Sequence, residues 1–148
     1  MASLPSVPAT TTDDLVEALA TRLAGEPDVA VAYLFGSHAR GTAGPRSDVD
    51  VAVLLAGEPS PGRHLDLVDA VAEVVGSERA DVVVLNDAPV ALAYQVLRDG
   101  RRLVVSDEVA RVRHWVRTVD RYLDMAPMRQ TLEHGLRHRL QEGRFGRP

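Results

Sequence analysis

Two apolar runs of strand length, residues 29–35 and 51–55, most constrain the fold of this chain. Both are rich in β-branched residues and are apolar on both alternating faces, as expected of strands in a sheet that helices cover. A segment with several glycines and polar residues connects them. The order strand, glycine turn, short helix, strand predicts an α/β (α+β) fold in which helices flank a small β-sheet.

The connecting segment begins with Gly36 and Ser37. We expect Gly36 to let the backbone turn sharply after the first strand, and Ser37 to cap the helix that begins there. The start of a helix carries unpaired N–H groups and the positive end of the helix dipole, so it can bind a phosphate group. A plain helix cap is the alternative interpretation of Ser37.

Two carboxylates, Asp48 and Asp50, end the same segment. Residues two apart on a strand project from the same face, roughly 7 Å apart along the chain. Such a pair repels and resists ionisation unless a cation lies between the carboxylates, and Mg2+ takes one or two carboxylates together with substrate phosphates. An Asp-x-Asp sequence alone also fits a solvated turn. Its combination with the Gly-Ser pair, between two strands of buried type, favours a magnesium-nucleotide site.

The stretch from residue 36 to 55 resembles the signature of the DNA polymerase β-like nucleotidyltransferase superfamily, and most closely that of its small bacterial branch, the minimal nucleotidyltransferases. These proteins carry Gly-Ser-x-Ala-Arg-Gly before Ser-Asp-x-Asp. The matching residues are Gly36, Ser37, Ala39, Arg40, Gly41, Ser47, Asp48 and Asp50. The resemblance covers about half of the chain, and it implies the polymerase β-like fold with its small mixed sheet, followed here by C-terminal helices.

The resemblance also implies a third carboxylate on a further strand. Asp81 is the best candidate, because it opens another short apolar run. Asp48, Asp50 and Asp81 are then the expected catalytic residues and ligands of two Mg2+ ions, with ATP as the substrate. An Asp at a strand start also fits a simple end cap.

Nucleotide binding is expected at Gly36, Ser37 and Arg40. Arg40 follows Ser37 by about one helical turn and can reach a phosphate of the nucleotide. A salt bridge to the acidic half of the chain is an equally good interpretation of Arg40.

Members of this branch often act as antitoxins beside a HEPN-domain ribonuclease toxin. The resemblance therefore implies that the chain transfers AMP from ATP to a tyrosine hydroxyl of a cognate HEPN toxin, encoded by a neighbouring gene, and forms a hetero-oligomer with it. Only about 40 residues of C-terminal helix remain beyond the sheet, fewer than a separate substrate domain needs. Two alternatives stay open: a small-molecule, aminoglycoside-type nucleotidyltransferase, and an antitoxin that acts by binding alone.

The 148 residues, 45% of them hydrophobic, predict one domain over 1–148, with flexible ends at 1–10 and 143–148. Cysteine is absent, which excludes disulfides and thiolate metal sites. We expect a cytoplasmic protein without a membrane segment, because no run is long enough to span a bilayer and the N-terminus lacks a secretory signal. Low aromatic content (4%) and a net charge of −4 argue against direct nucleic-acid binding.

The C-terminal third is basic, with 11 Arg and 6 acidic residues over 101–148, against 6 Arg and 15 acidic residues over 1–100. It can lie across the acidic half, meet triphosphate, face an acidic partner or form a solvated helix surface.

Apolar spacing predicts helices that begin near residues 11, 65, 89 and 106, and another after Pro127. Apolar residues mark each helix: Leu15, Leu19 and Leu23 lie on one face of the first, Leu65, Val68, Ala72 and Val75 mark the second, and Leu132, Leu136 and Leu140 mark the last. The helix after residue 106 should bury Val109, Val112, Val116, Val119 and Leu123. We expect Trp115 and Tyr122 to pack inside the fold or against a partner.

Overall fold

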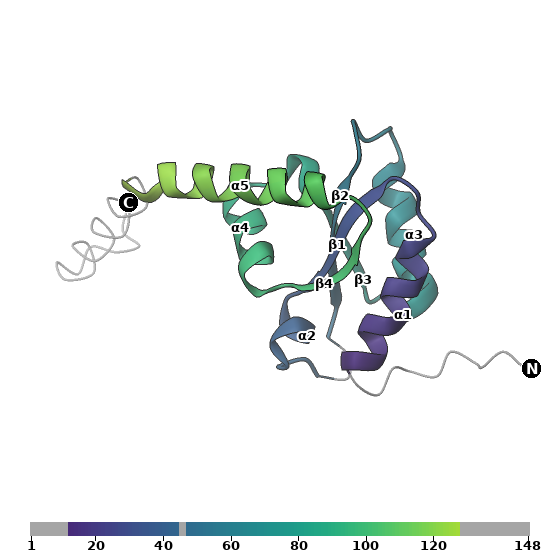
Figure 1. Cartoon of the computed structure of the whole chain (residues 1–148). Coiled ribbons are helices and arrows are strands. Elements are labelled where there is room, and N and C mark those ends of the chain that lie inside the picture. The colour runs from purple at the N-terminus through teal and green to yellow at the C-terminus, as the bar shows by residue number, and fades with distance from the viewer. Residues whose placement is uncertain (1–11, 45–46, 128–148) are drawn as a thin grey trace, which may run out of the picture.

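The computed structural model describes residues 12–44 and 47–127 (Figure 1). In chain order the elements are α1 (Thr12–Ala24), β1 (Val29–Phe35), α2 (Ser37–Arg40), β2 (Val49–Leu55), α3 (Arg63–Val75), β3 (Ala80–Val84), the 3-10 helix η1 (Leu85–Asp87), α4 (Val90–Asp99), β4 (Arg101–Val105) and α5 (Glu108–Asp124). The predicted order of strands and helices is therefore confirmed over this part of the chain. None of the helices in these residues is long and apolar enough to cross a bilayer.

The sheet has four strands in the order β3-β2-β1-β4. β1 pairs antiparallel with both β2 and β4, whereas β2 pairs in parallel with β3, so the sheet is mixed as predicted. All of β1 is buried, and so is β2 except for Asp50. Continuous burial of the two central strands explains why both of their faces are apolar in the sequence.

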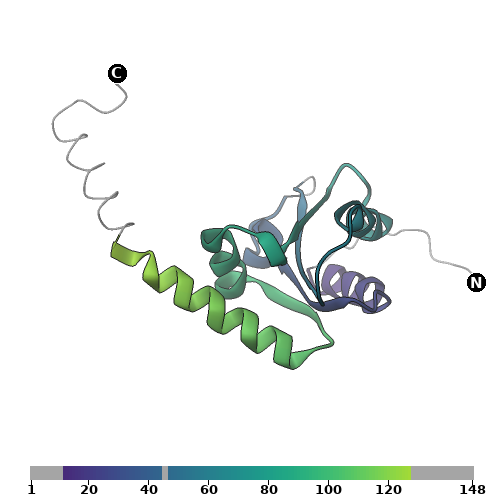
Figure 2. The ribbon, with the colours of Figure 1, turned by 90° about the horizontal axis from the view of Figure 1, so that it is seen from above.

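Helices cover both faces of the sheet (Figures 1 and 2). On one face, α1 and α3 pack on side chains such as Leu34, Val51 and Val53. On the other face, α4 and η1 pack against Val31, Tyr33 and Leu54. The sheet is therefore the middle layer of three, and the chemistry of the chain must lie at its ends or edges.

Helices α1 and α3 can be compared with the apolar residues that the sequence marked on them. In α1 the predicted face is confirmed, because Leu15, Leu19 and Leu23 are all buried. In α3 the spacing located the helix but does not mark its buried face: Leu65 is 65% exposed, and Val68 and Val75 are only partly buried. The buried residues are instead Leu67, Ala70 and Val71. The sequence of α3 holds two overlapping apolar stripes, and contact with β3 and α1 selects between them.

The largest correction concerns α5. Its predicted stripe faces solvent, with Val109 59% and Leu123 60% exposed, while His114 and Thr118 are buried. The reason lies in α4, which already covers this side of the sheet and leaves α5 to pack on α4 and one end of β1. The predicted helix after Pro127 and its residues Leu132, Leu136 and Leu140 lie outside the described residues.

Candidate active site

The carboxylates of Asp50 and Asp81 lie together at the same end of β2 and β3. The parallel register of these strands sets Asp50 directly opposite Asp81, so their side chains project from the same face of the sheet. Asp50 is half-buried and Asp81 is exposed. Of the Asp-x-Asp residues, only Asp50 has Asp81 as its register partner, because Asp48 lies before the start of β2.

The acidity of Asp50 reflects these surroundings. Burial, together with repulsion and a hydrogen bond from the Asp81 carboxyl, raises the pKa of the Asp50 carboxyl to about 6. The charge of Asp48 acts in the same direction, whereas the Arg40 guanidinium lowers the pKa. Without a cation, then, this end of the sheet disfavours a fully ionised set of carboxylates.

Asp48 lies one residue before β2 and is exposed. Among the described residues, no three His, Cys, Asp or Glu side chains are gathered into a ready-made metal site. Mg2+ does not require one, because it is usually held by one or two carboxylates plus phosphates and water. The close pair Asp50 and Asp81, with Asp48 beside it, therefore fits a Mg2+ ion that binds together with a nucleotide.

Gly36 serves the site in two ways. Its backbone has φ 75° and ψ −152°, a conformation that side chains disfavour. In addition, a Cβ at this position would overlap Oδ2 of Asp50. The sequence predicted the turn, but only the structure shows that the missing side chain makes room for the carboxylate.

Ser37 does not cap α2, and this prediction is wrong. Gly36 is the N-cap residue, since its carbonyl accepts the hydrogen bond of Arg40 N at 3.1 Å. Ser37 is consequently the first helical residue, and its carbonyl accepts a hydrogen bond from Thr42 N at 3.0 Å. The Ser37 hydroxyl therefore does not satisfy the helix end, and the N–H groups of this turn have no side-chain cap.

Arg40 is exposed at the end of α2. Its charge lowers the pKa of both Asp50 and Asp99, so the guanidinium lies near the carboxylate pair. The stronger partner of Asp99 is Arg98, at 2.9 Å. Among the described residues Arg40 forms no ion pair within 4.0 Å, so it remains available to a phosphate group.

The loop before Asp48 is held by Arg79 and His38, neither of which the sequence assigned to the site. Arg79 donates from Nε to the Ser47 carbonyl at 3.3 Å, and the His38 ring lies 3.4 Å from the same oxygen. The Val49 amide donates to the Arg79 carbonyl at 2.8 Å. These contacts fix the chain on both sides of Asp48. No local pattern could reveal the role of Arg79, which is 32 residues from Ser47 in sequence.

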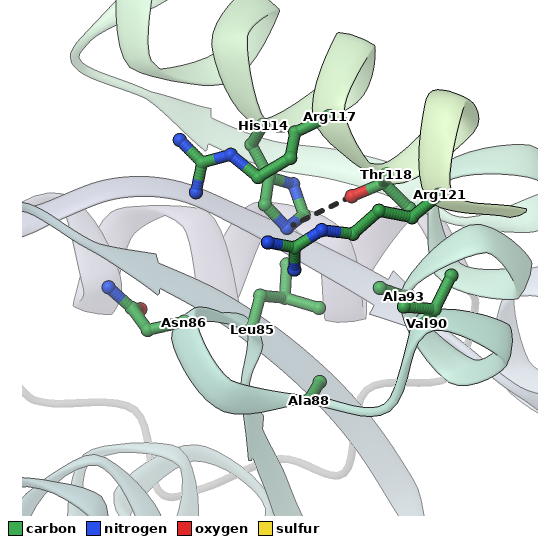
Figure 3. Close-up of a pocket in the computed structure, with 9 residues that line it drawn as sticks. All are labelled: Leu85, Asn86, Ala88, Val90, Ala93, His114, Arg117, Thr118 and Arg121. Carbon is green, nitrogen blue, oxygen red and sulfur yellow. Dashed lines mark hydrogen bonds between the residues drawn. The ribbon is translucent and has the colours of Figure 1, made fainter. Parts of the chain in front are cut away.

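A second feature is the basic pocket in Figure 3. It is lined by Leu85, Asn86, Ala88, Val90, Ala93, His114, Arg117, Thr118 and Arg121. His114 is buried, its Nδ1 has no hydrogen-bond partner in the described part of the chain, and burial together with Arg117 lowers its pKa. The pocket adjoins η1, which follows the end of β3 opposite Asp81. It is therefore separate from the carboxylate pair.

A mixed sheet that sets carboxylates on neighbouring strands beside a glycine turn defines a nucleotidyltransferase of the polymerase β type. The family described as "Polymerase beta, Nucleotidyltransferase" matches residues 17–109. The chain belongs to this family, and the resemblance seen in residues 36–55 is confirmed.

Relatives and solved structures agree with this assignment. The protein adenylyltransferase MntA of Shewanella oneidensis is 35% identical over 77 residues, which are 52% of this chain and 55% of the relative. The chain thus matches about half the length of that curated relative. A toxin-antitoxin crystal structure with AMP-PNP is similar at 27% identity and a TM-score of 0.68, covering 82% of this chain and 97% of that chain. A mutant MntA-HpeT toxin-antitoxin structure is similar at 28% identity and a TM-score of 0.64, covering 78% and 92%.

Proposed function

We propose that this chain is a Mg2+-dependent protein adenylyltransferase that acts as an antitoxin. It transfers AMP from ATP to a tyrosine hydroxyl of a cognate HEPN ribonuclease toxin and so neutralises the toxin. The observation that carries the proposal is the Asp50 and Asp81 pair, held against the Gly36 turn in a chain of this family. The relative named protein adenylyltransferase MntA and the toxin-antitoxin structure with AMP-PNP support the reaction and the partner.

The nucleotide is bound by the turn and the helix that follows β1. Its triphosphate lies on the Gly36–Ser37 turn, where backbone N–H groups lack a side-chain cap. Arg40 neutralises a terminal phosphate or the departing pyrophosphate, since its exposed guanidinium lies near Asp50. The α-phosphate is thereby directed toward the carboxylates of β2 and β3.

Asp48, Asp50 and Asp81 would hold two Mg2+ ions. When bound, the metal neutralises phosphate charge and lowers the pKa of the acceptor hydroxyl. Burial raises the pKa of Asp50, and repulsion from Asp81 and Asp48 adds to the rise; a bound cation would favour the ionised carboxylates.

In the transfer step, the tyrosine oxygen forms a bond to the α-phosphorus of ATP. The bond from that phosphorus to the bridging oxygen breaks, and pyrophosphate leaves with the bonding electrons. Asp81 is exposed at the strand start and accepts the hydroxyl proton. The remaining work is positioning and charge stabilisation, as is general for phosphoryl-type transfer.

The test is intact-mass spectrometry of the toxin after co-expression with this chain. We expect a toxin heavier by one or more AMP units with the wild type, and an unmodified toxin with Asp50→Asn. Asp87→Asn is the matched control, because Asp87 is exposed in η1 at the far end of β3. An unmodified toxin beside a folded wild-type chain would refute the proposal.

Two further readouts separate the alternatives. If Asp48→Ala with Asp50→Ala leaves neutralisation intact, the antitoxin acts by binding alone. If pyrophosphate is released with an aminoglycoside and without toxin, the chain is a small-molecule nucleotidyltransferase.

A further inference from the structure

The outer face of α5 is apolar along its whole length. Val109, Val112, Val116 and Leu123 are 59%, 43%, 46% and 60% exposed. With Val119 they recur at alternating spacings of three and four residues, which is the heptad pattern of a helix that packs against another helix. Trp115, at the border of this face, is 48% exposed. We call Val109, Val112, Val116, Val119 and Leu123 the α5 seam.

The seam points away from the body of the protein. α5 contacts the domain through its other side, where His114 and Thr118 are buried and Tyr122 stacks on Tyr94 with ring centroids 3.7 Å apart. Both Figure 1 and Figure 2 show α5 running along the outside of the domain and reaching beyond α4. A row of large apolar side chains in this position is costly in water unless another molecule covers it.

Two opposite charges border the seam on the same flank. Arg113 and Asp120 are exposed, and neither forms an ion pair within 4.0 Å among the described residues. Arg113 directly follows Val112 and Asp120 directly follows Val119, so both occupy the same flanking position of the heptad. When two such helices pack antiparallel, this flanking position on one helix faces the same position on the other, so the charges there favour or disfavour pairing.

We propose that the α5 seam is the interface of a homodimer in which two copies of α5 pack antiparallel. With Val116 of one copy opposite Val119 of the other, Val112 faces Leu123 and Arg113 meets Asp120. Because the interface is two-fold symmetric, each of these contacts occurs twice. The second copy is thus the occupant whose charges complement the seam.

A parallel pair of helices satisfies these charges less well. It would bring Arg113 toward Glu108, which is already bound by Arg111. Asp120 would then face Trp115 instead of a cation. The antiparallel arrangement leaves neither charge without a partner.

The length of the seam sets the expected affinity. α5 has 17 residues, and a helix of this length spans about 25 Å. One helix pair of this size lies at the lower end of specific interfaces, so we expect a reversible dimer with a micromolar Kd.

Sedimentation equilibrium of the full-length chain, without ATP or toxin, tests the proposal independently of the proposed function. We expect a monomer–dimer equilibrium for the wild type between about 1 and 200 µM. Val116→Asp should weaken the dimer about 100-fold or more, because it sets two buried carboxylates near the two-fold axis. Arg113→Asp should weaken it about tenfold by replacing two attractive pairs with two repulsive ones.

The decisive variant is Arg113→Asp combined with Asp120→Arg, which restores opposite charges only if each residue meets the other across the interface. We expect a return to near the wild-type Kd. Arg117→Asp is the matched control, because it makes the same charge change on α5 outside the seam. All of these positions are exposed, and far-UV circular dichroism verifies folding.

Four results would overturn the proposal. A wild-type chain that stays monomeric at 200 µM removes the dimer. A Val116→Asp variant with the wild-type Kd, or a double swap without rescue, removes this interface. A monomeric chain whose binding to the toxin is abolished by Val116→Asp assigns the seam to the toxin instead.

Discussion

Replacing Asp50 by Asn should stabilise the metal-free protein at neutral pH, although it removes a residue of the candidate active site. In the unfolded chain this carboxyl has a pKa of 3.8, whereas in the folded chain burial and Asp81 raise it to about 6. The folded state therefore binds more protons between these values, and wild-type stability falls as the pH rises through this window. Asn has nearly the same shape and carries no charge, so the variant avoids this loss.

The pKa difference sets the size of the effect. A rise from 3.8 to about 6 corresponds to about 3 kcal/mol at pH values above both. Asp50 is only half-buried, and solvent screening reduces the gain to about 1–2 kcal/mol. For a chain of this size, that raises Tm by about 2–8 °C.

Thermal denaturation in EDTA, followed from pH 4 to pH 8, measures the difference between Asp50→Asn and the wild type. We expect the gain to grow between pH 4 and pH 6 and then to stay constant. Mg2+ should stabilise the wild type and have little effect on the variant. Asp87→Asn, an exposed carboxylate outside the pair, is the control and should show no such pH-dependent gain. An Asp50→Asn variant that is no more stable than the wild type at pH 7.5 would refute this account of the site.

Other substitutions and conditions test the remaining parts of the site. Gly36→Ala should abolish AMP transfer and lower the free energy of unfolding by about 1–3 kcal/mol, because the new Cβ overlaps the Asp50 carboxylate and the φ of 75° is strained for alanine. Gly41→Ala is the control: its φ is 76° but the space around it is open, so it should keep most of its activity. AMP transfer assays and urea unfolding compare the two variants. Arg79→Ala should raise the Mg2+ concentration needed for half-maximal transfer several-fold, because the Ser47 carbonyl loses a hydrogen-bond donor. The far-UV spectrum should stay unchanged, and an unchanged Mg2+ requirement would contradict this role of Arg79. The rate of transfer at limiting Mg2+ should fall as the pH drops below about 6, because protonated Asp50 binds the metal poorly. Saturating Mg2+ should move the midpoint of this pH profile to lower pH. A pH profile that does not respond to Mg2+ would speak against Asp50 as a metal ligand.

Local sequence patterns predicted the elements of the fold well. β1 and β2 were expected from continuous apolar runs, and both are central strands of the sheet. The α1 face was also correct, because one apolar stripe there has no competitor. In α3 two stripes overlap, and the choice between them depends on β3 and α1, which no local pattern records.

The candidate site divides in the same way. The spacing from Gly36 to Asp50 lies within one segment, so the sequence could show it. The contacts of Arg79 and His38 with Ser47, and the space that Gly36 leaves for Asp50, join atoms across the fold. Ser37 was predicted to be the cap because its residue type prefers that position, but the backbone turn at Gly36 shifts the helix start by one residue.

By itself, the sequence indicated a nucleotide-binding type of site, because the glycine turn and the two carboxylates lie within one short segment of the backbone. The tertiary structure decided that Asp81 stands opposite Asp50, since only the parallel register of β2 and β3 brings them together. It also decided that the apolar stripe of α5 faces outward. Periodicity shows that a helix has an apolar face. Whether that face is buried within the chain or exposed to another molecule depends on which other elements already cover the sheet.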